Sequence, residues 1–339
     1  MIVLGIETSC DECSVALVED GRRIVAQTVA TQLEEHAPYN GVVPEIASRT
    51  HTQWIAGVYE GVLRRAGLQA TQIGGIAVTT RPGLVGSLVV GLSFAKALAY
   101  GLGVPLVGVN HILAHLYAPQ LEQRIPYPYA GLLVSGGHTM ICDVQSPLEM
   151  EVIGTTIDDA CGEAFDKVAK HYNLGYPGGV AIDRLAASGD PEAFSFPDSQ
   201  LHKGNHRYDV SYSGLKTAVI NHAEHYLNDG AAFTPENLAA SFQRAAIDMI
   251  VRRVRRRCRE QHVERVVVGG GVAANSYLRA ALPRELGADV AVHFPSSALC
   301  ADNGAMIAGL GYHQLEAGER ADLSLDVLAR VPGFRKTYP

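Results

Sequence analysis

Apolar and polar positions follow a pattern that occurs twice along the chain, and this duplication predicts the fold. In the first half, three short apolar runs joined by tight turns predict a three-stranded meander: IVLGIETS, CSVALVED and RRIVAQTVA. A helix is expected from about Pro44 to Arg65. The segments after it are typical of a strand, an apolar helix and a strand: IGGIAVTT, LVGSLVVGLSFAKALAYGL and PLVGVN.

The second half repeats this order with different residues. AGLLVSG, TMICDV and MEVIGTT predict the meander, and DDACGEAFDKVAKHY predicts the helix after it. A polar stretch from about Asp183 to Glu236 is interpreted as an insertion with a short helix near Gly214 to Glu224. The remaining segments alternate between helix and strand and end in a helix from about Asp302: LAASFQRAAIDMIVRRVRRRCREQ, ERVVVGGG, ANSYLRAALPREL and DVAVHF.

Two such halves predict an α/β protein with two lobes, a duplicated βββαβαβα order and mixed five-stranded sheets. We place the N-terminal lobe, with the first hairpin, at about 1–110 and the C-terminal lobe at about 111–324, with the insertion at about 183–236. A C-terminal segment of about 325–339 can return to the first lobe. Small ligands usually bind between lobes, so the chemistry is expected in a cleft there.

Composition narrows the class of protein. The 339 residues are 47% hydrophobic and 19% charged, which is typical of a globular chain with two cores. The start, MIVLGIETSC, has no basic region before a long apolar run, and no apolar run reaches membrane-spanning length, so we expect a cytoplasmic protein without a signal peptide or membrane contact. Six cysteines are too few for a disulfide framework, and the Cys10–Cys13 spacing between two strands disfavours a redox role.

The charge distribution bears on nucleic-acid binding. A net charge of -7 argues against broad, nonspecific binding, so any RNA contact needs a local basic patch or a partner protein. One helix carries a dense basic run, Arg252, Arg253, Arg255, Arg256, Arg257 and Arg259. Such a run is compatible with a solvated helix face and with a contact to a phosphate backbone.

Glycine-containing turns are the candidate nucleotide-binding elements. The first hairpin turns of the two meanders, Thr8–Cys13 and Val134–Thr139, fall at matching places. In the second, Gly136 and Gly137 allow positive φ and close approach of a ligand, and the side chains of Ser135, His138 and Thr139 add donors. VSGGHT could therefore cradle phosphate or adenylate oxygens, although a plain hairpin turn has the same composition.

A third glycine cluster, Gly269–Gly271, ends a buried strand and opens a helix. A purine could lie on this flat backbone, with Asn275 at the helix start offering its amide. The alternative is a tight strand-to-helix turn.

The histidine pair in HILAH is the candidate metal site. His111 and His115 are four residues apart and so share one helix face, where two imidazoles can bind one ion. Asp302 is the best third ligand, because it begins a helix at the equivalent end of the other half, across the expected cleft. Two histidines and one carboxylate leave open coordination positions and suit Fe(2+) or Zn(2+). The alternative is two hydrogen-bonded structural histidines.

Carboxylates gather near the turns. Asp11 and Glu12 lie in the first hairpin, where either could be a general base or hold a cation. Asp158 or Asp159 is most simply an N-cap, with Glu163 completing it. Asp166 and Asp183 could bind a ribose or another hydroxyl group, or belong to a solvated face.

These motifs together resemble the family of tRNA threonylcarbamoyladenosine synthases of the bacterial TsaD type, once described as O-sialoglycoprotein endopeptidases. The resemblance covers nearly the whole chain and rests on ordered blocks that include GIETSCDE, TRPGLVGSLVVG, NHILAH, LLVSGGHT, DDACGEAFDK, YPGG, YSGLKT, GGGVAANSYLR and CADNGAM. It implies an ATPase fold of the actin, sugar-kinase and Hsp70 type. It also implies a metal held by His111, His115 and Asp302, and an adenylate site formed by Val134, Ser135, Gly136, Gly137, His138, Asp166, Gly179, Asp183 and Asn275.

The resemblance further implies the reaction and its partners. The threonylcarbamoyl group of L-threonylcarbamoyladenylate would pass to the exocyclic N6 amine of the adenosine 3' of the anticodon, in tRNAs that read codons starting with A, and AMP would leave. Partners implied in this way are a paralogous TsaB-type subunit and a small TsaE-type ATPase.

Three other functions are possible for parts of this sequence. A metalloprotease is disfavoured because HILAH has no glutamate beside the first histidine. A sugar or acetate kinase on the same fold would need magnesium at the phosphates and has no use for two imidazoles. An ATP-driven scaffold would hydrolyse ATP without transferring a group to any small molecule.

Overall fold

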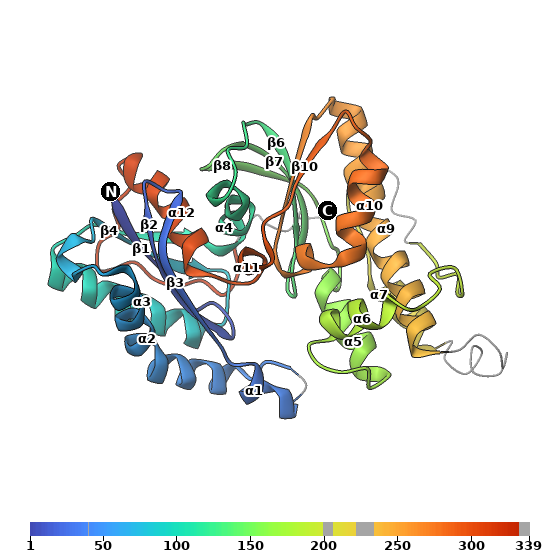
Figure 1. The fold of residues 1–339 in the computed structure, drawn as a ribbon, viewed down its shortest axis with the longest axis horizontal. Helices are drawn as coiled ribbons and strands as arrows, with labels where there is room; N and C mark the ends of the chain where they lie inside the picture. The colour runs from blue at the N-terminus through green and yellow to red at the C-terminus, as the bar shows by residue number, and fades with distance from the viewer. Residues whose placement is uncertain (40, 199–205, 222–233, 332–339) are drawn as a thin grey trace. The chain divides into compact units, whose positions relative to one another are not determined.

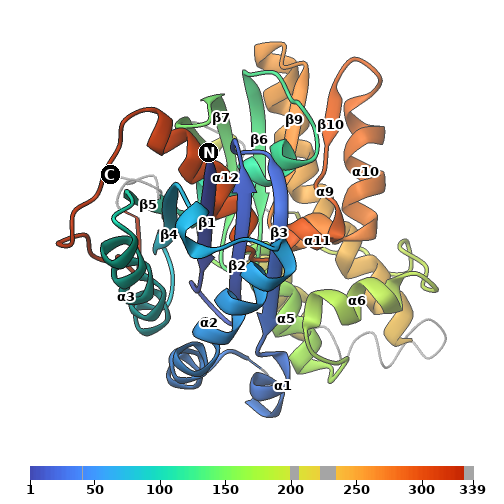
Figure 2. The same cartoon turned by 60° about the vertical axis from the view of Figure 1, so that its left-hand side comes forward.

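The chain divides into two units, each built around a five-stranded sheet (Figures 1 and 2). The computed structural model describes residues 1–39, 41–198, 206–221 and 234–331. Of these, unit 1 contains Met1–Pro126, Gln145–Met150 and 297–331, and unit 2 contains Tyr127–Val144 and Glu151–Ser296. The expected lobe boundary at about residue 110 therefore differs from this division, and the described part of the segment after 324 belongs to unit 1.

The sheet of unit 1 has the strand order β3-β2-β1-β4-β5. Its strands are β1 (Ile2–Glu7), β2 (Glu12–Glu19), β3 (Arg23–Thr31), β4 (Gly75–Arg81) and β5 (Leu106–Asn110). The meander β1-β2-β3 is antiparallel, whereas β4 is parallel to both β1 and β5. The predicted three-strand meander and the mixed sheet are confirmed.

Helices cover both faces of this sheet, which is why β1 is a continuous buried run (Figure 1). One core packs β1, β2 and β4 against α2 (Pro44–Ala66) and α3 (Val85–Leu102). The other packs the opposite face against α12 (Gly304–Glu316) and α4 (His111–Tyr117). Short helical segments complete unit 1: α1 (Leu33–His36), η1 (Ala37–Tyr39), η2 (Ala70–Gln72), η3 (Ala118–Leu121) and α11 (Ser297–Cys300).

The approach of α12 to β1 depends on two glycines. A Cβ atom on Gly5 would lie 2.1 Å from the carbonyl oxygen of Gly304, and a Cβ on Gly304 would lie 2.9 Å from the carbonyl oxygen of Gly5. The helix begins after Asn303, whose side chain accepts a hydrogen bond from Met306 N at 2.9 Å. These contacts fix the position of Asp302, the residue before the cap.

The sheet of unit 2 has the order β10-β9-β6-β7-β8, which is the topology of unit 1 read from the other edge. Its strands are β6 (Tyr129–Val134), β7 (Thr139–Ser146), β8 (Glu149–Thr155), β9 (Arg265–Gly269) and β10 (Ala291–His293). Its helices are α5 (Cys161–His171), α6 (Gly178–Ala186), α7 (Ser213–Asn221), α9 (Pro235–Gln261) and α10 (Ser276–Leu286), with η5 (Gly271–Ala274). The duplication predicted from the sequence is confirmed.

The expected insertion contains α6 from Asp183 onward and the helix α7, which agrees with the short helix expected near Gly214. Its positions 199–205 and 222–233, like 332–339 at the C-terminus, lie outside the described residues.

One helix of the described residues, α3, is long and apolar enough to cross a membrane by length and composition alone. In unit 1 it packs against α2 and β4 as a core helix, and its inward face includes Leu88, Leu92, Ala95 and Ala99.

Candidate metal centre

The two histidines of the candidate metal centre come from one helix that starts directly after a strand. Strand β5 ends at Asn110, whose side chain accepts a hydrogen bond from Ile112 N at 3.0 Å and so caps α4. His111 and His115 then lie on the same face of α4 and are 8% and 1% exposed. The other face of the helix packs against α12.

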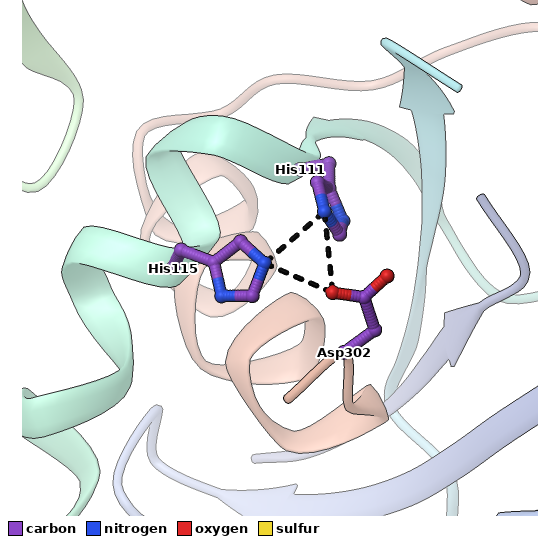
Figure 3. A group of neighbouring side chains, drawn as sticks. All are labelled: His111, His115 and Asp302. Atoms are coloured by element: carbon purple, nitrogen blue, oxygen red, sulfur yellow. Dashed lines mark hydrogen bonds and ion pairs between the residues drawn. The ribbon is translucent and has the colours of Figure 1, made fainter. Parts of the chain in front are cut away.

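Asp302 completes the cluster (Figure 3). Its Oδ1 atom lies 3.0 Å from His115 Nε2 and 3.5 Å from His111 Nε2, and the two Nε2 atoms lie 3.1 Å apart. Ligand atoms at zinc bond lengths around a tetrahedral ion would lie about 3.3 Å from one another. The donor atoms therefore already have the spacing and the chemistry of a two-histidine, one-carboxylate metal centre.

All three ligands belong to unit 1, which corrects the expectation that Asp302 reaches the histidines from the other half. The physical reason is the packing of α12. This helix is last in the duplicated order, but its apolar side chains fill the core against β1, β4 and β5. Asp302, just before that helix, is therefore carried to α4.

Sequence reasoning missed Glu7, which lies against the cluster at the end of β1. Its side chain is fully buried, and Oε2 lies 2.9 Å from His111 Nδ1. Ser9 Oγ lies 3.3 Å from the same nitrogen. The signal was present in the sequence, because a carboxylate inside an apolar buried strand must find hydrogen-bonding partners.

The electrostatics of the cluster follow from two carboxylates beside two imidazoles. Burial lowers the pKa of His111, but the charges of Asp302 and Glu7 outweigh burial and raise the pKa to about 9. The pKa of His115 is lowered by burial and by the neighbouring His111. Burial opposes ionisation of Glu7, yet its interaction with His111 lowers the Glu7 pKa. Two carboxylates thus favour positive charge beside the imidazoles, and a bound metal ion would supply positive charge at the same place.

The first hairpin places Glu12 within electrostatic range of Asp302. Glu12 is the first residue of β2, and its pKa is raised to about 10 by burial and then by repulsion from Asp302 and Asp11. A neutral carboxyl group donates a proton and cannot act as a base. A dication beside Asp302 would reverse this repulsion and favour ionised Glu12.

The second hairpin forms the predicted glycine turn in unit 2. Ser135 N donates to His138 O at 2.8 Å, and His138 N donates to Ser135 Oγ at 3.1 Å. Neither Gly136 nor Gly137 has positive φ, so that part of the expectation is wrong. A Cβ atom on either glycine would meet no atom within 4 Å, so their backbone has open space for a close ligand.

Two further contacts in unit 2 involve the other candidate adenylate residues. Gly270 has a φ of +94°, and a Cβ there would lie 2.3 Å from the carbonyl oxygen of Val134, the last residue of β6. Asp166 Oδ1 accepts a hydrogen bond from Gly178 N at 2.9 Å, beside Gly179, where a Cβ would meet no atom within 4 Å. All residues expected to bind adenylate belong to unit 2.

Asn275 differs from its expected role. Its Oδ1 caps α10 by accepting from Leu278 N at 2.9 Å, and its Nδ2 donates to Asp183 at 3.1 Å and to Gln243 at 2.8 Å. The amide is occupied at both ends. Asp183 also accepts from Ser276 Oγ at 2.7 Å, so Asn275 and Ser276 together orient this carboxylate.

Two other expectations are corrected. The N-cap residue of α5 is Ala160, with Glu163 accepting from Ala160 N, whereas Asp158 accepts from Tyr212 N at 2.8 Å and Asp159 binds Lys167 and Lys216. These two aspartates therefore join separate segments of unit 2 instead of capping the helix.

The arginine run of α9 is not a free basic face. Arg253 is 2% exposed and donates to backbone carbonyl oxygens, and Arg252 and Arg255 pair with Asp198 and Glu285 at 2.9 and 2.8 Å. Arg257 pairs with Asp143. Three carboxylates of unit 2, Asp198, Glu285 and Asp143, therefore balance part of the charge of the six arginines.

Solved structures with a similar fold define the class of protein. HypF of T. kodakarensis is similar with a TM-score of 0.63 and 15% identity, over 93% of this chain and 48% of that chain. Component A of the Acidaminococcus fermentans (R)-2-hydroxyglutaryl-CoA dehydratase is similar with a TM-score of 0.55 and 17% identity, over 94% of this chain and 100% of that chain. The chain is thus a protein of the actin-like ATPase fold that carries a buried two-histidine, one-carboxylate cluster.

Comparison of sequences identifies the family. The family model described as TsaD, tRNA N6-adenosine threonylcarbamoyltransferase, matches residues 23–309. A protein of that name from Treponema denticola is 56% identical over 336 residues, which are 99% of each chain. Another from Borrelia garinii subsp. bavariensis is 47% identical over 339 residues, covering 100% of this chain and 99% of the relative. The chain belongs to the TsaD family.

Proposed function

We propose that this chain transfers the threonylcarbamoyl group of L-threonylcarbamoyladenylate to the N6 amine of the adenosine 3' of the anticodon in tRNAs that read codons starting with A. The observation that carries the proposal is family membership over the full chain, together with relatives named tRNA N6-adenosine threonylcarbamoyltransferase. The enzyme is accordingly an acyltransferase with tRNA as a substrate.

In this proposal His111, His115 and Asp302 hold one divalent ion, Fe(2+) or Zn(2+). The donor spacing and the imidazole-rich set support it, because imidazole suits both ions and three protein ligands leave open positions. A metal bound there would act as a Lewis acid on oxygens of the mixed anhydride and polarise the carbonyl group under attack.

The adenylate half of the donor is assigned to unit 2. The open backbone of Gly136 and Gly137 suits phosphate oxygens, since N–H groups in a turn bind anions. Asp183, oriented by Asn275 and Ser276, has a carboxylate for ribose hydroxyl groups. Val134, Ser135, His138, Asp166 and Gly179 complete the proposed site.

The transfer needs a proton acceptor. The adenosine N6 forms a bond to the carbamoyl carbon, the bond from that carbon to the adenylate oxygen breaks, and AMP leaves with the electron pair. The attacking amine must lose one proton. Asp11 and Glu12 are the proposed acceptors because they lie in the first hairpin. Glu12 would have to be ionised for this role, and positive charge beside Asp302 would favour its ionised form.

We further propose a cytoplasmic enzyme that works with a TsaB-type subunit and a TsaE-type ATPase. The net charge of -7 and the internal pairing of the α9 arginines support a need for partners, because tRNA binding requires positive charge that these residues do not offer freely.

Reconstitution tests the proposal. The intact protein and the His111→Ala variant are incubated with threonylcarbamoyladenylate and unmodified tRNA, with and without the partner proteins, and modified adenosine and AMP are measured. Transfer by the intact protein and its loss in the variant are expected. Hydrolysis of ATP without any modified tRNA, under all of these conditions, would instead favour an ATP-driven scaffold.

A further inference from the structure

We propose that Glu7 is a positioning residue for the metal centre: it holds His111 in the tautomer and orientation in which Nε2 is the metal ligand. The inference rests on the metal-centre part of the proposed function. Glu7 is buried and contacts His111, but its carboxylate does not lie among the atoms of His111, His115 and Asp302 that would bind the metal.

Glu7 has a complete set of hydrogen-bond donors around it. Its Oε1 accepts from Ser9 N at 2.5 Å, and its Oε2 accepts from Thr79 Oγ1 at 2.6 Å. The third donor is His111 Nδ1, which lies 2.9 Å from Oε2. Glu7 and Thr79 are both 0% exposed, so water does not compete for these bonds. A carboxylate held by three fixed donors has essentially one orientation.

This arrangement determines the protonation of the His111 ring. A carboxylate only accepts hydrogen bonds, so His111 must carry its proton on Nδ1. In the neutral ring, Nε2 then has the free lone pair, and that atom faces His115 Nε2 and Asp302 Oδ1 (Figure 3). A carboxylate bonded to the far nitrogen also raises the basicity of a metal-binding imidazole.

The two histidines of the cluster differ in this respect. His115 Nδ1 is buried and has no hydrogen-bond partner among the residues that the structure describes. On the Nδ1 side, therefore, only the His111 ring contacts a carboxylate. Ionised Glu7 and Asp302 together carry two negative charges, which match the charge of a divalent ion.

Glu7→Gln is the most informative substitution because it keeps the side-chain shape. Ser9 N is an obligate donor, so the amide oxygen must stay on it, and the amide NH2 group then faces Thr79 and His111. His111 then keeps only the more distant Ser9 Oγ, at 3.3 Å, as an acceptor for an Nδ1 proton. The tautomer that accepts at Nδ1 and carries its proton on Nε2, where the metal should bind, is therefore favoured. We expect metal affinity to fall by roughly 10–100-fold.

Thr79→Val provides a second arm that leaves the carboxylate in place. It removes one donor to Glu7 with almost no change of shape, so we expect a smaller loss, of about a few-fold. Thr80→Val is the matched control: Thr80 is the next residue of β4 and equally buried, but its hydroxyl group is directed to Val109 O at 3.5 Å. Its metal affinity should equal that of the intact protein.

The experiment measures Zn(2+) dissociation constants by competition with a chelator and the visible absorption of the Co(2+)-loaded full chain. Glu7→Gln should weaken Zn(2+) binding and change the Co(2+) bands, with a smaller effect of Thr79→Val and none of Thr80→Val.

His111→Ala separates the two proposals. If His111→Ala weakens Zn(2+) binding, but Glu7→Gln and Thr79→Val have Zn(2+) dissociation constants within two-fold of that of the intact protein and the same Co(2+) spectrum, the role of Glu7 is refuted and the metal centre stands. If His111→Ala binds equally well, both proposals fail. If Glu7→Gln does not fold, Thr79→Val against Thr80→Val decides the question.

Discussion

Substitution of Gly5 by alanine should weaken the metal centre without touching any ligand. The added Cβ atom would lie 2.1 Å from Gly304 O and 2.5 Å from Ala308 N, whereas ordinary contacts begin at 3.4 Å. Both atoms are backbone atoms of α12, so relief requires a movement of the helix relative to β1 by about 1 Å, and overpacking of this kind costs about 3 kcal/mol. Asp302 stands two residues before Gly304 and must move with it.

The consequence for metal binding can be estimated from bond lengths. Metal–ligand distances tolerate changes of about 0.2 Å, so a 1 Å displacement of Asp302 removes its bond or strains it severely. We expect Zn(2+) affinity to fall by at least the roughly 10–100-fold that the loss of an orienting partner costs.

Two alanine variants control for the change of residue type and for destabilisation. Gly57→Ala lies in α2, where a Cβ meets no atom within 4 Å, and should stabilise the protein by about 0.4–1 kcal/mol. Gly311→Ala meets Ala77 Cβ at 2.3 Å, far along α12 from Asp302, and should destabilise with less loss of affinity. Thermal unfolding and chelator competition measure both effects. A folded Gly5→Ala protein that is destabilised like Gly311→Ala but binds Zn(2+) as tightly as the intact protein would refute the coupling.

Three further predictions follow from the cited contacts. The pKa of His111 is raised to about 9 without metal, so protons compete with the metal for its Nε2 below that pH. The Zn(2+) affinity should therefore weaken by about tenfold for each unit that the pH falls from 9 toward 7, and an affinity independent of pH in chelator titrations would contradict this. Arg253→Ala should lower the free energy of unfolding by about 2–5 kcal/mol, because it removes a buried side chain together with its hydrogen bonds to the carbonyl oxygens of Met249 and Asp209. Exposed Arg259→Ala should change it by less than about 0.5 kcal/mol in urea titrations. Asn275→Ala should weaken AMP binding by about tenfold, because the hydrogen bond that orients Asp183 is lost. Calorimetry measures the affinity for AMP, and an effect confined to thermal stability would show that Asn275 only caps α10.

The sequence was sufficient for features that depend on local pattern. The duplicated meander appears in both sheets because strand and helix periods are local, and the i, i+4 spacing of His111 and His115 fixes a shared helix face wherever the helix lies. It was not sufficient for long-range partners. The sequence predicts Asp302 as the third neighbour of the histidines but predicts the wrong half for it, because only the packing of α12 decides which sheet that helix covers.

The same limit explains the misjudged charges. The arginines of α9 were compatible with a phosphate contact because their partners, among them Asp143 and Asp198, are distant in sequence. Asp158 stands where a cap residue would, but it holds Tyr212 and its neighbours instead. The residues next to a charged residue in the sequence indicate that it needs a hydrogen-bond or ion-pair partner. They do not indicate which distant residue is that partner.

Strand β1 shows how one short run of sequence supports both arms of the metal centre. Val3, Gly5 and Glu7 alternate with Leu4 and Ile6, so they share the face that packs against α4 and α12. On that face, Gly5 lets α12 approach and so positions Asp302, while Glu7 bonds to His111. Because both faces of the strand are buried, the alternation is one of size and charge rather than of hydrophobicity. The hydrophobic pattern therefore does not show the period of two, although this period places Gly5 and Glu7 on the same face of β1.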